Sequence, residues 1–196
     1  SITINFSVSI ALTSAVTKAY GTTTAEGVRQ AADLAFTTVK LGQTSFPELA
    51  GAIGKVAISS SGLKITQEEL NAVFATMTGV TGGAAEVSTQ YRGALVGLKK
   101  PSDAMFVALD RLGFKTGEAA IETLGFQGTL EALTTQTGGN TLEMAKLFDS
   151  TESWDFIAGI AGVQAEKFKG NLEAMEGATG TLGEALKEQQ EGVNAA

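Results

Sequence analysis

Three carboxylates, at Asp149, Glu152 and Asp155, stand three residues apart and flank the single tryptophan of the chain. Carboxylates at this spacing share one side of a helix, where they could hold a cation or act as an acid and base pair. The same pattern is typical of a helix N-terminus, where acidic side chains interact favourably with the helix dipole. The second interpretation is favoured, because nothing singles out one pair among the 21 acidic residues.

The acidic residues are also the only support for a catalytic function. A cell-wall hydrolase domain would need two carboxylates at the scissile bond, and it would draw on Glu143, Asp149 and Glu152. The chain has no His and no Cys, so Ser-His-Asp and Cys-His systems, disulfides, and thiolate or imidazole metal sites cannot be built from it. We therefore predict that it is not an enzyme and has no catalytic, cofactor-binding or metal-binding residues.

Two glycine-containing segments resemble nucleotide-binding loops only in part. Residues 51–55 lack the second half of the phosphate-loop motif, and they fall inside a predicted helix instead of between a strand and a helix. Residues 177–183 do not have the glycine spacing of a dinucleotide-binding loop. Both segments indicate helix breaks or close-packing positions, so no cofactor is expected.

The composition excludes further classes of function. The chain of 196 residues has a net charge of −7, and its longest basic run is Lys99 and Lys100. This argues against a nucleic-acid-binding protein, which needs an excess of Lys and Arg to neutralise phosphates. No apolar run reaches the roughly 18 residues that a membrane span requires. The three small residue types Gly, Ala and Thr number 24, 29 and 24.

Small residues recur at four-residue spacing, as at Gly93 and Gly97 or at Ala50 and Gly54. Ala158 with Gly162 and Gly159 with Val163 show the same spacing. Such positions let helix backbones approach closely. Packing within one domain is the favoured interpretation, and packing between copies of the chain, or against a membrane after a conformational change, is the alternative. Trp154 and the phenylalanines are expected in the core.

The elements that position these residues are predicted to be helices. Only residues 2–10 alternate apolar and polar types, which predicts an extended segment that pairs with a strand from elsewhere. We therefore divide the chain into an extended lead-in over 1–10 and a helical domain over 11–196. A start without Met suggests a piece of a longer chain. Glycines and prolines separate the runs of an all-α fold of roughly ten short amphipathic helices, over 11–20, 24–40, 45–62, 66–79, 84–98, 101–113, 116–124, 128–137, 141–149, 152–163, 165–176 and 178–190.

Several motifs follow one another in a set order. The two strongest are Gly42-Gln43-Thr44-Ser45-Phe46-Pro47-Glu48-Leu49-Ala50 and the stretch from Lys100-Pro101-Ser102 to Leu112-Gly113. The others are Ile53-Gly54-Lys55-Val56, the capping-box helix over 65–79, Arg92-Gly93-Ala94-Leu95, Leu147-Phe148-Asp149-Ser150-Thr151-Glu152 and Leu172-Glu173-Ala174-Met175. Over about residues 11–190, this series resembles the conserved core region of the tape measure proteins of tailed bacteriophages and related prophages.

The resemblance implies a structural protein of a phage tail or a phage-like tail. Tape measure proteins occupy the lumen of the tail tube, set its length and leave through the tip during genome ejection. The implied partners are copies of itself, for example a trimer, and the proteins of the tail tube and of the tip or baseplate hub. Phage DNA is implied only as a neighbour, and contact with the host membrane belongs to ejection. The implied locations are the tail lumen or tip of the virion, and the host cytoplasm during assembly.

As one continuous helix, 196 residues would span only about 290 Å, at 1.5 Å per residue. The chain therefore looks like one domain of a tape measure protein and not the part that measures. The main alternative from composition is a self-assembling helical filament subunit or a secreted surface protein. Such proteins usually carry long terminal heptad repeats, which are missing here.

Overall fold

Eleven α-helices and one short π-helix form the structure, a computed structural model that describes residues 6–194. No strand occurs within that range, so the all-α prediction is confirmed. In chain order the helices are α1 (Phe6–Tyr20), α2 (Ala25–Leu41), α3 (Phe46–Gly62), α4 (Gln67–Met77), α5 (Ala84–Lys99), α6 (Asp103–Arg111), α7 (Gly117–Gln136), α8 (Thr141–Ala145), α9 (Thr151–Ala158), the π-helix η1 (Gly159–Val163), α10 (Ala165–Glu176) and α11 (Thr181–Asn194).

The extended segment predicted over residues 2–10 is wrong for residues 6–10, which form the first turns of α1. The rest of that prediction, at residues 2–5, lies outside the described residues. The described part offers no strand for such a segment to pair with, whereas a helix that has started in the Ala-rich stretch extends at little cost. Ile10 is 54% exposed, while Leu12 and Val16, four residues apart, are buried. Packing therefore follows the helical period.

Side-chain caps fix where the helices begin. The side chains of Ser45 and Thr66 each accept a hydrogen bond from the backbone amide three residues on. In return, the carboxylates of Glu48 and Glu69 each accept a hydrogen bond from the backbone amide of the capping residue. Both capping boxes satisfy amides that have no partner inside the helix. Thr24, Ser102, Thr116 and Asn140 cap α2, α6, α7 and α8 in the simpler way, with one side-chain acceptor each.

Glycines bend helices in the second half of the chain. Where two helices were predicted over 116–124 and 128–137, α7 is one run that bends at Gly125, with φ 75° and ψ 170°. The helix predicted over 152–163 ends as α9 at Ala158 and continues as the π-helix η1, which is distorted at Gly162. Breaks of this kind are expected where a residue without Cβ allows backbone angles that other residues avoid.

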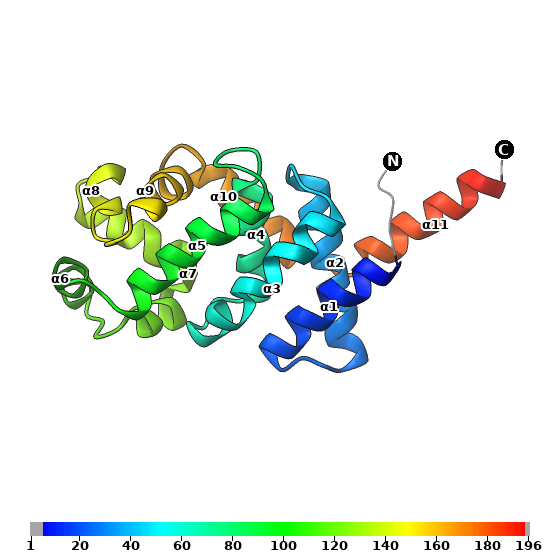
Figure 1. Ribbon diagram of the computed structural model, residues 1–196, viewed down its shortest axis with the longest axis horizontal. Coiled ribbons are helices and arrows are strands. Elements are labelled where there is room, and N and C mark those ends of the chain that lie inside the picture. The colour runs from blue at the N-terminus through cyan, green and yellow to red at the C-terminus, as the bar shows by residue number, and fades with distance from the viewer. Residues whose placement is uncertain (1–5, 195–196) are drawn as a thin grey trace.

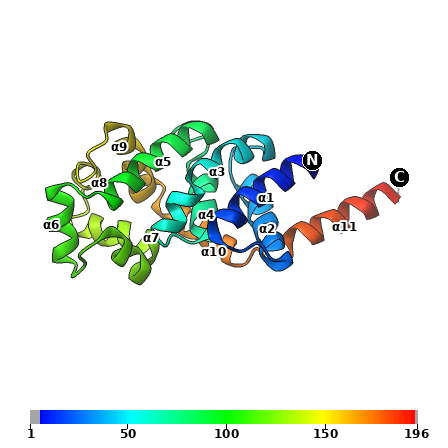
Figure 2. The same cartoon turned by 60° about the horizontal axis from the view of Figure 1, so that its bottom comes forward.

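The helices lie in two layers along an elongated molecule (Figures 1 and 2). One layer holds α1, α3, α5 and α9, each packed against the next. Behind it, α4 packs between α2 and α10. At one end of the molecule lie α6 and α8, and at the other end α11 projects beyond the body (Figure 1).

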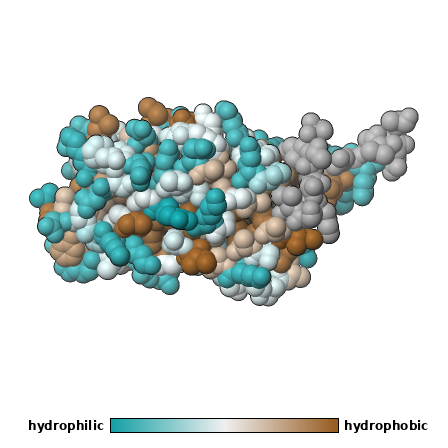
Figure 3. Space-filling model, viewed as in Figure 1, coloured by the Kyte–Doolittle hydropathy of each residue, from teal (hydrophilic) through white to brown (hydrophobic). Residues whose placement is uncertain are grey.

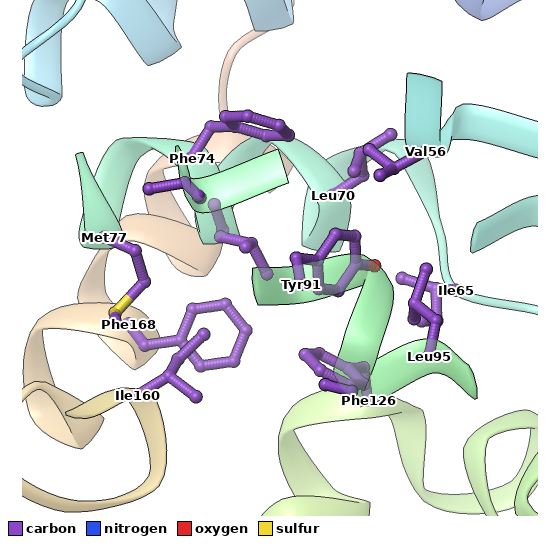
Figure 4. Close-up of a cluster of buried hydrophobic side chains, with 14 of the residues drawn as sticks. Val56, Ile65, Leu70, Phe74, Met77, Tyr91, Leu95, Phe126, Ile160 and Phe168 are labelled. Atoms are coloured by element: carbon purple, nitrogen blue, oxygen red, sulfur yellow. The ribbon is translucent and has the colours of Figure 1, made fainter. Parts of the chain in front are cut away.

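The core is centred on α4, whose residues from Glu69 onward are all buried. Tyr91 of α5 forms an edge-to-face contact with Phe126 of α7, at a centroid distance of 5.8 Å, and Phe126 makes a similar contact with Phe168 at 6.2 Å. Figure 4 shows the Phe168 ring beside Met77 and Ile160, and the Tyr91 and Phe126 rings on the side of the cluster that holds Leu95. Helices distant in sequence thus share one core. Two aromatic residues that were predicted to lie in the core are instead partly exposed, Trp154 at 39% and Phe106 at 47%.

Candidate functional site

The structure brings two of the three spaced carboxylates into one surface cleft. Glu152 and Asp155 of α9 line it together with Glu86 of α5, and its volume is about 430 Å³. Asp149 precedes α9 and does not line the cleft. The sequence missed Glu86, because it lies more than 60 residues away in the chain and only the packing of α5 against α9 brings it close.

One side of the cleft is bounded by close packing between α5 and α9. Gly93 faces Ser150 and Ser153, and a Cβ built on Gly97 would lie 2.7 Å from the Phe148 ring. The indole Nε1 of Trp154 donates to the carbonyl of Phe148 at 3.0 Å. These contacts fix one side of α9 against α5 and leave its acidic side turned outward. Gly93 and Gly97 therefore serve packing within the domain, the interpretation that the sequence favoured.

The chemistry of the cleft is that of an acidic hollow. Besides its carboxylates the cleft is lined by the polar side chains of Thr89 and Gln90. An acceptor-rich hollow suits a hydrogen-bond donor with positive charge. Within residues 6–194, no group of three or more acidic side chains has the arrangement of a metal site.

The residues that a hydrolase would use are not gathered into a site. Of Glu143, Asp149 and Glu152, only Glu152 lines the cleft. The Glu143 carboxylate stands in the first turn of α8 and pairs with Lys146 at 2.6 Å, with both side chains more than half exposed. This is the arrangement of a solvated surface pair that also favours the helix dipole.

Neither glycine segment forms a phosphate-binding loop. Residues 51–55 lie in the middle of α3, where the backbone amides are used within the helix. Residues 177–180 connect α10 to α11, and residues 181–183 begin α11. Asp33 of α2 already binds amides there, because its carboxylate accepts hydrogen bonds from Gly180 N and Leu182 N, both at 2.9 Å. Asp33 is 3% exposed and anchors α11 to the body.

A second buried carboxylate joins two helices. Glu69, besides closing the capping box of α4, accepts a hydrogen bond from the backbone amide of Phe126 at 2.5 Å, where α7 restarts after Gly125. Burial raises the pKa of Glu69, although the backbone hydrogen bonds from Thr66, Phe126 and Gln127 act in the opposite direction. The sequence indicated the capping box, but no local signal pointed to the contact with α7.

Within the described part of the chain, no helix combines the length and the hydropathy needed to cross a bilayer. Comparison with known proteins gives one family: a model described as phage-related minor tail protein matches residues 6–149. No curated protein matches the chain, and no solved structure does.

Proposed function

The chain belongs to the family of phage-related minor tail proteins, and from this membership we propose that it is a domain of a tail tape measure protein. The membership itself makes the chain a component of a phage tail that works with other tail components. The finer assignment comes from the ordered motifs, and the two strongest, over residues 42–50 and 100–113, both lie inside the matched region.

The motif residues have structural tasks, which supports a structural function. Ser45 and Glu48 form the capping box of α3, and Pro47 occupies its first turn. Ser102 caps α6 through Met105 N, and its hydroxyl also donates to the carbonyl of Leu147 at 3.0 Å. Residues that define helix starts and helix contacts are what a scaffold requires. None of these residues lines the acidic cleft.

In the proposed function the domain sits in the tail tube or at the tail tip. It takes part in tail assembly and length determination as one part of a longer chain, and it leaves the tail during genome ejection. Its proposed partners are copies of itself, tube proteins and the tip or baseplate hub. DNA is a neighbour in the tail, and the host membrane a contact during ejection. Helices interrupted at Gly125 and Gly162 suit a domain that must rearrange to leave.

We propose no catalytic activity and no cofactor. Support comes from the positions of the candidate carboxylates, since Glu143 is ion-paired and Asp149 lies outside the cleft that holds Glu152. A peptidoglycan-degradation assay is the direct test, and the expected result is no activity. Activity that disappears when Glu143, Asp149 and Glu152 are changed to Ala would overturn this part of the proposal.

Electron cryomicroscopy of virions tests the proposed location. A small folded tag is inserted between Gly138 and Gly139, an exposed turn in which both residues have positive φ. We expect the extra density inside the tail tube or at its tip. Density on the outer surface of the tail, or on the capsid, would contradict the proposal.

A further inference from the structure

Helix α5 carries its charges in two separate halves on the outer surface. Its N-terminal half contributes Glu86 to the acidic cleft, where Glu152 and Asp155 join it from α9. Its C-terminal end carries Lys99, and Lys100 follows directly, both exposed. The helix dipole favours acids at one end of a helix and bases at the other, and the start of α9, with Glu152 in its first turn, adds a second helix N-terminus at the acidic end of α5.

The neighbouring helix α3 extends this pattern. The Ser88 hydroxyl donates to the carbonyl of Ala52 at 3.2 Å. Four residues on, the Arg92 guanidinium donates to the carbonyl of Lys55 at 2.8 Å, so α3 and α5 run parallel. Glu48, exposed near the start of α3, therefore stands toward the acidic end of this surface.

Two large aliphatic side chains lie exposed between these charges. Ile58 of α3 is 75% exposed and Val96 of α5 is 54% exposed. Figure 3 shows apolar atoms among hydrophilic ones on the side of the molecule that presents α3 and α5. We call this surface the α3–α5 face and define it by Glu48, Ile58, Glu86, Val96, Lys99 and Lys100. The two exposed aliphatic side chains, with charged ones around them, offer apolar area that a contact with another protein could bury.

We propose that the α3–α5 face binds a second copy of the same face, with the two α5 helices antiparallel. A two-fold axis that crosses α5 between Arg92 and Gly93 lays the basic end of each chain over the acidic end of the other. Lys100 of each chain then enters the acidic cleft of its partner, and Lys99 approaches the partner's start of α3. A symmetric contact of this kind must be self-complementary, and the charge separation along α5 provides that property.

The same register matches large side chains with small ones. Val96 of one chain lies opposite Thr89 of the other, and Ile58 lies over the exposed Gly51 region of α3. The two Arg92 side chains approach each other at the axis, where each guanidinium donates to the carbonyl of Lys55 in its own chain. The cleft favours an ammonium group because three carboxylates, those of Glu86, Glu152 and Asp155, line it.

This contact rests on one part of the proposed function, the binding of copies of the chain to each other, and assigns a surface to it; a trimer would need a different surface. Charge reversal tests it on the 196-residue chain. One variant reverses the basic end of the face with Lys99→Glu and Lys100→Glu. The other variant reverses the acidic end with Glu86→Lys and Asp155→Lys. Sedimentation equilibrium should give twice the chain mass of 20.1 kDa for the unchanged protein. Each variant alone should associate at least about tenfold more weakly, because like charges then face each other.

Mixing the two variants should restore the dimer, because the reversed charges are then complementary. The control carries Lys167→Glu and Lys169→Glu, an equal charge change at exposed positions of α10 in the other layer, and should dimerise like the unchanged protein. An unchanged protein that stays monomeric at millimolar concentration would overturn the proposal. Variants that dimerise alone as strongly as the unchanged protein would also overturn it.

Cross-linking tests the antiparallel register. Because the chain has no Cys, the single variants Thr89→Cys and Val96→Cys each introduce the only thiol. An equal mixture should form a disulfide-linked heterodimer under mild oxidation, while either variant alone should form at least about tenfold less. Equal cross-linking in all three samples would show random collision and would contradict this register.

Discussion

At the scale of single residues, Glu69 joins two helices through one buried carboxylate. One oxygen of its carboxylate accepts a hydrogen bond from Thr66 N at 3.1 Å, and the other oxygen accepts one from Phe126 N. Without the carboxylate, amides in the interior would lose their acceptors, and each buried unsatisfied group costs about 1–3 kcal/mol. Glu69 is thus the residue on which both the start of α4 and the bend in α7 depend.

Replacement of Glu69 by Ala should lower the free energy of unfolding by about 3 kcal/mol, since two or more backbone amides lose their partner. Urea denaturation followed by circular dichroism measures this change. Glu68→Ala is the matched control, because Glu68 is the adjacent acid and its hydrogen bond to Gln30 is exposed. A loss at Glu69 no larger than the loss at Glu68 would contradict the role assigned to it.

The raised pKa of Glu69 predicts a pH dependence of stability. Because the folded protein holds this proton more strongly than the unfolded chain, its contribution to stability is greatest below the ordinary Glu value of 4.5. The contribution falls as pH rises from there through the folded pKa. The unfolding free energy of the unchanged protein minus that of the Glu69→Gln variant should therefore decrease as the pH rises above 4.5. A difference that stays constant or increases would show that burial does not dominate.

At the scale of elements, glycines inside helices have opposite roles according to what they face. Gly97 of α5 meets the Phe148 ring, whereas nothing lies within 4 Å of a Cβ built on Gly170 of α10. Gly97→Ala should destabilise the protein by about 1–3 kcal/mol through overpacking. Gly170→Ala should stabilise it by about 0.5–1 kcal/mol, the ordinary gain of Ala over Gly in a helix. Thermal unfolding of both variants measures the two changes in stability. If both variants were stabilised, or both destabilised, the result would be inconsistent with this packing.

A second prediction at this scale concerns Asp33, whose carboxylate holds the start of α11 against the body. Asp33→Ala removes the acceptor for the amides of Gly180 and Leu182. Because loss of a helix cap costs about 1 kcal/mol, amides of α11 should exchange with solvent several-fold faster, while those of α4 stay unchanged. Hydrogen exchange read by mass spectrometry resolves the two helices, with the exposed Asp103→Ala as control. Uniformly faster exchange in both helices would indicate global destabilisation instead.

Over the whole molecule, the sequence predicted most of the fold because its signals are local. The cap at Thr66 and the glycine break at Gly125 depend on nearby residues, and both appear, although the break is a bend within α7 and not a separation of two helices. The extended segment is wrong for residues 6–10 because their alternation has no partner strand within the described part of the chain, and these residues join α1. The acidic cleft and the contact of Glu69 with α7 join distant helices, so neither could be predicted from spacing along the chain.

The central claim is that this chain is a tape measure domain that fills the tail and leaves it. A protease-sensitive tag between Gly138 and Gly139 tests the claim directly, read by immunoblot in intact virions and in tails that have ejected their DNA. In intact virions the tag should resist added protease, and emptied tails should have lost most of the chain. A tag that is cleaved in intact virions, or a chain that stays fully in emptied tails, would contradict the claim.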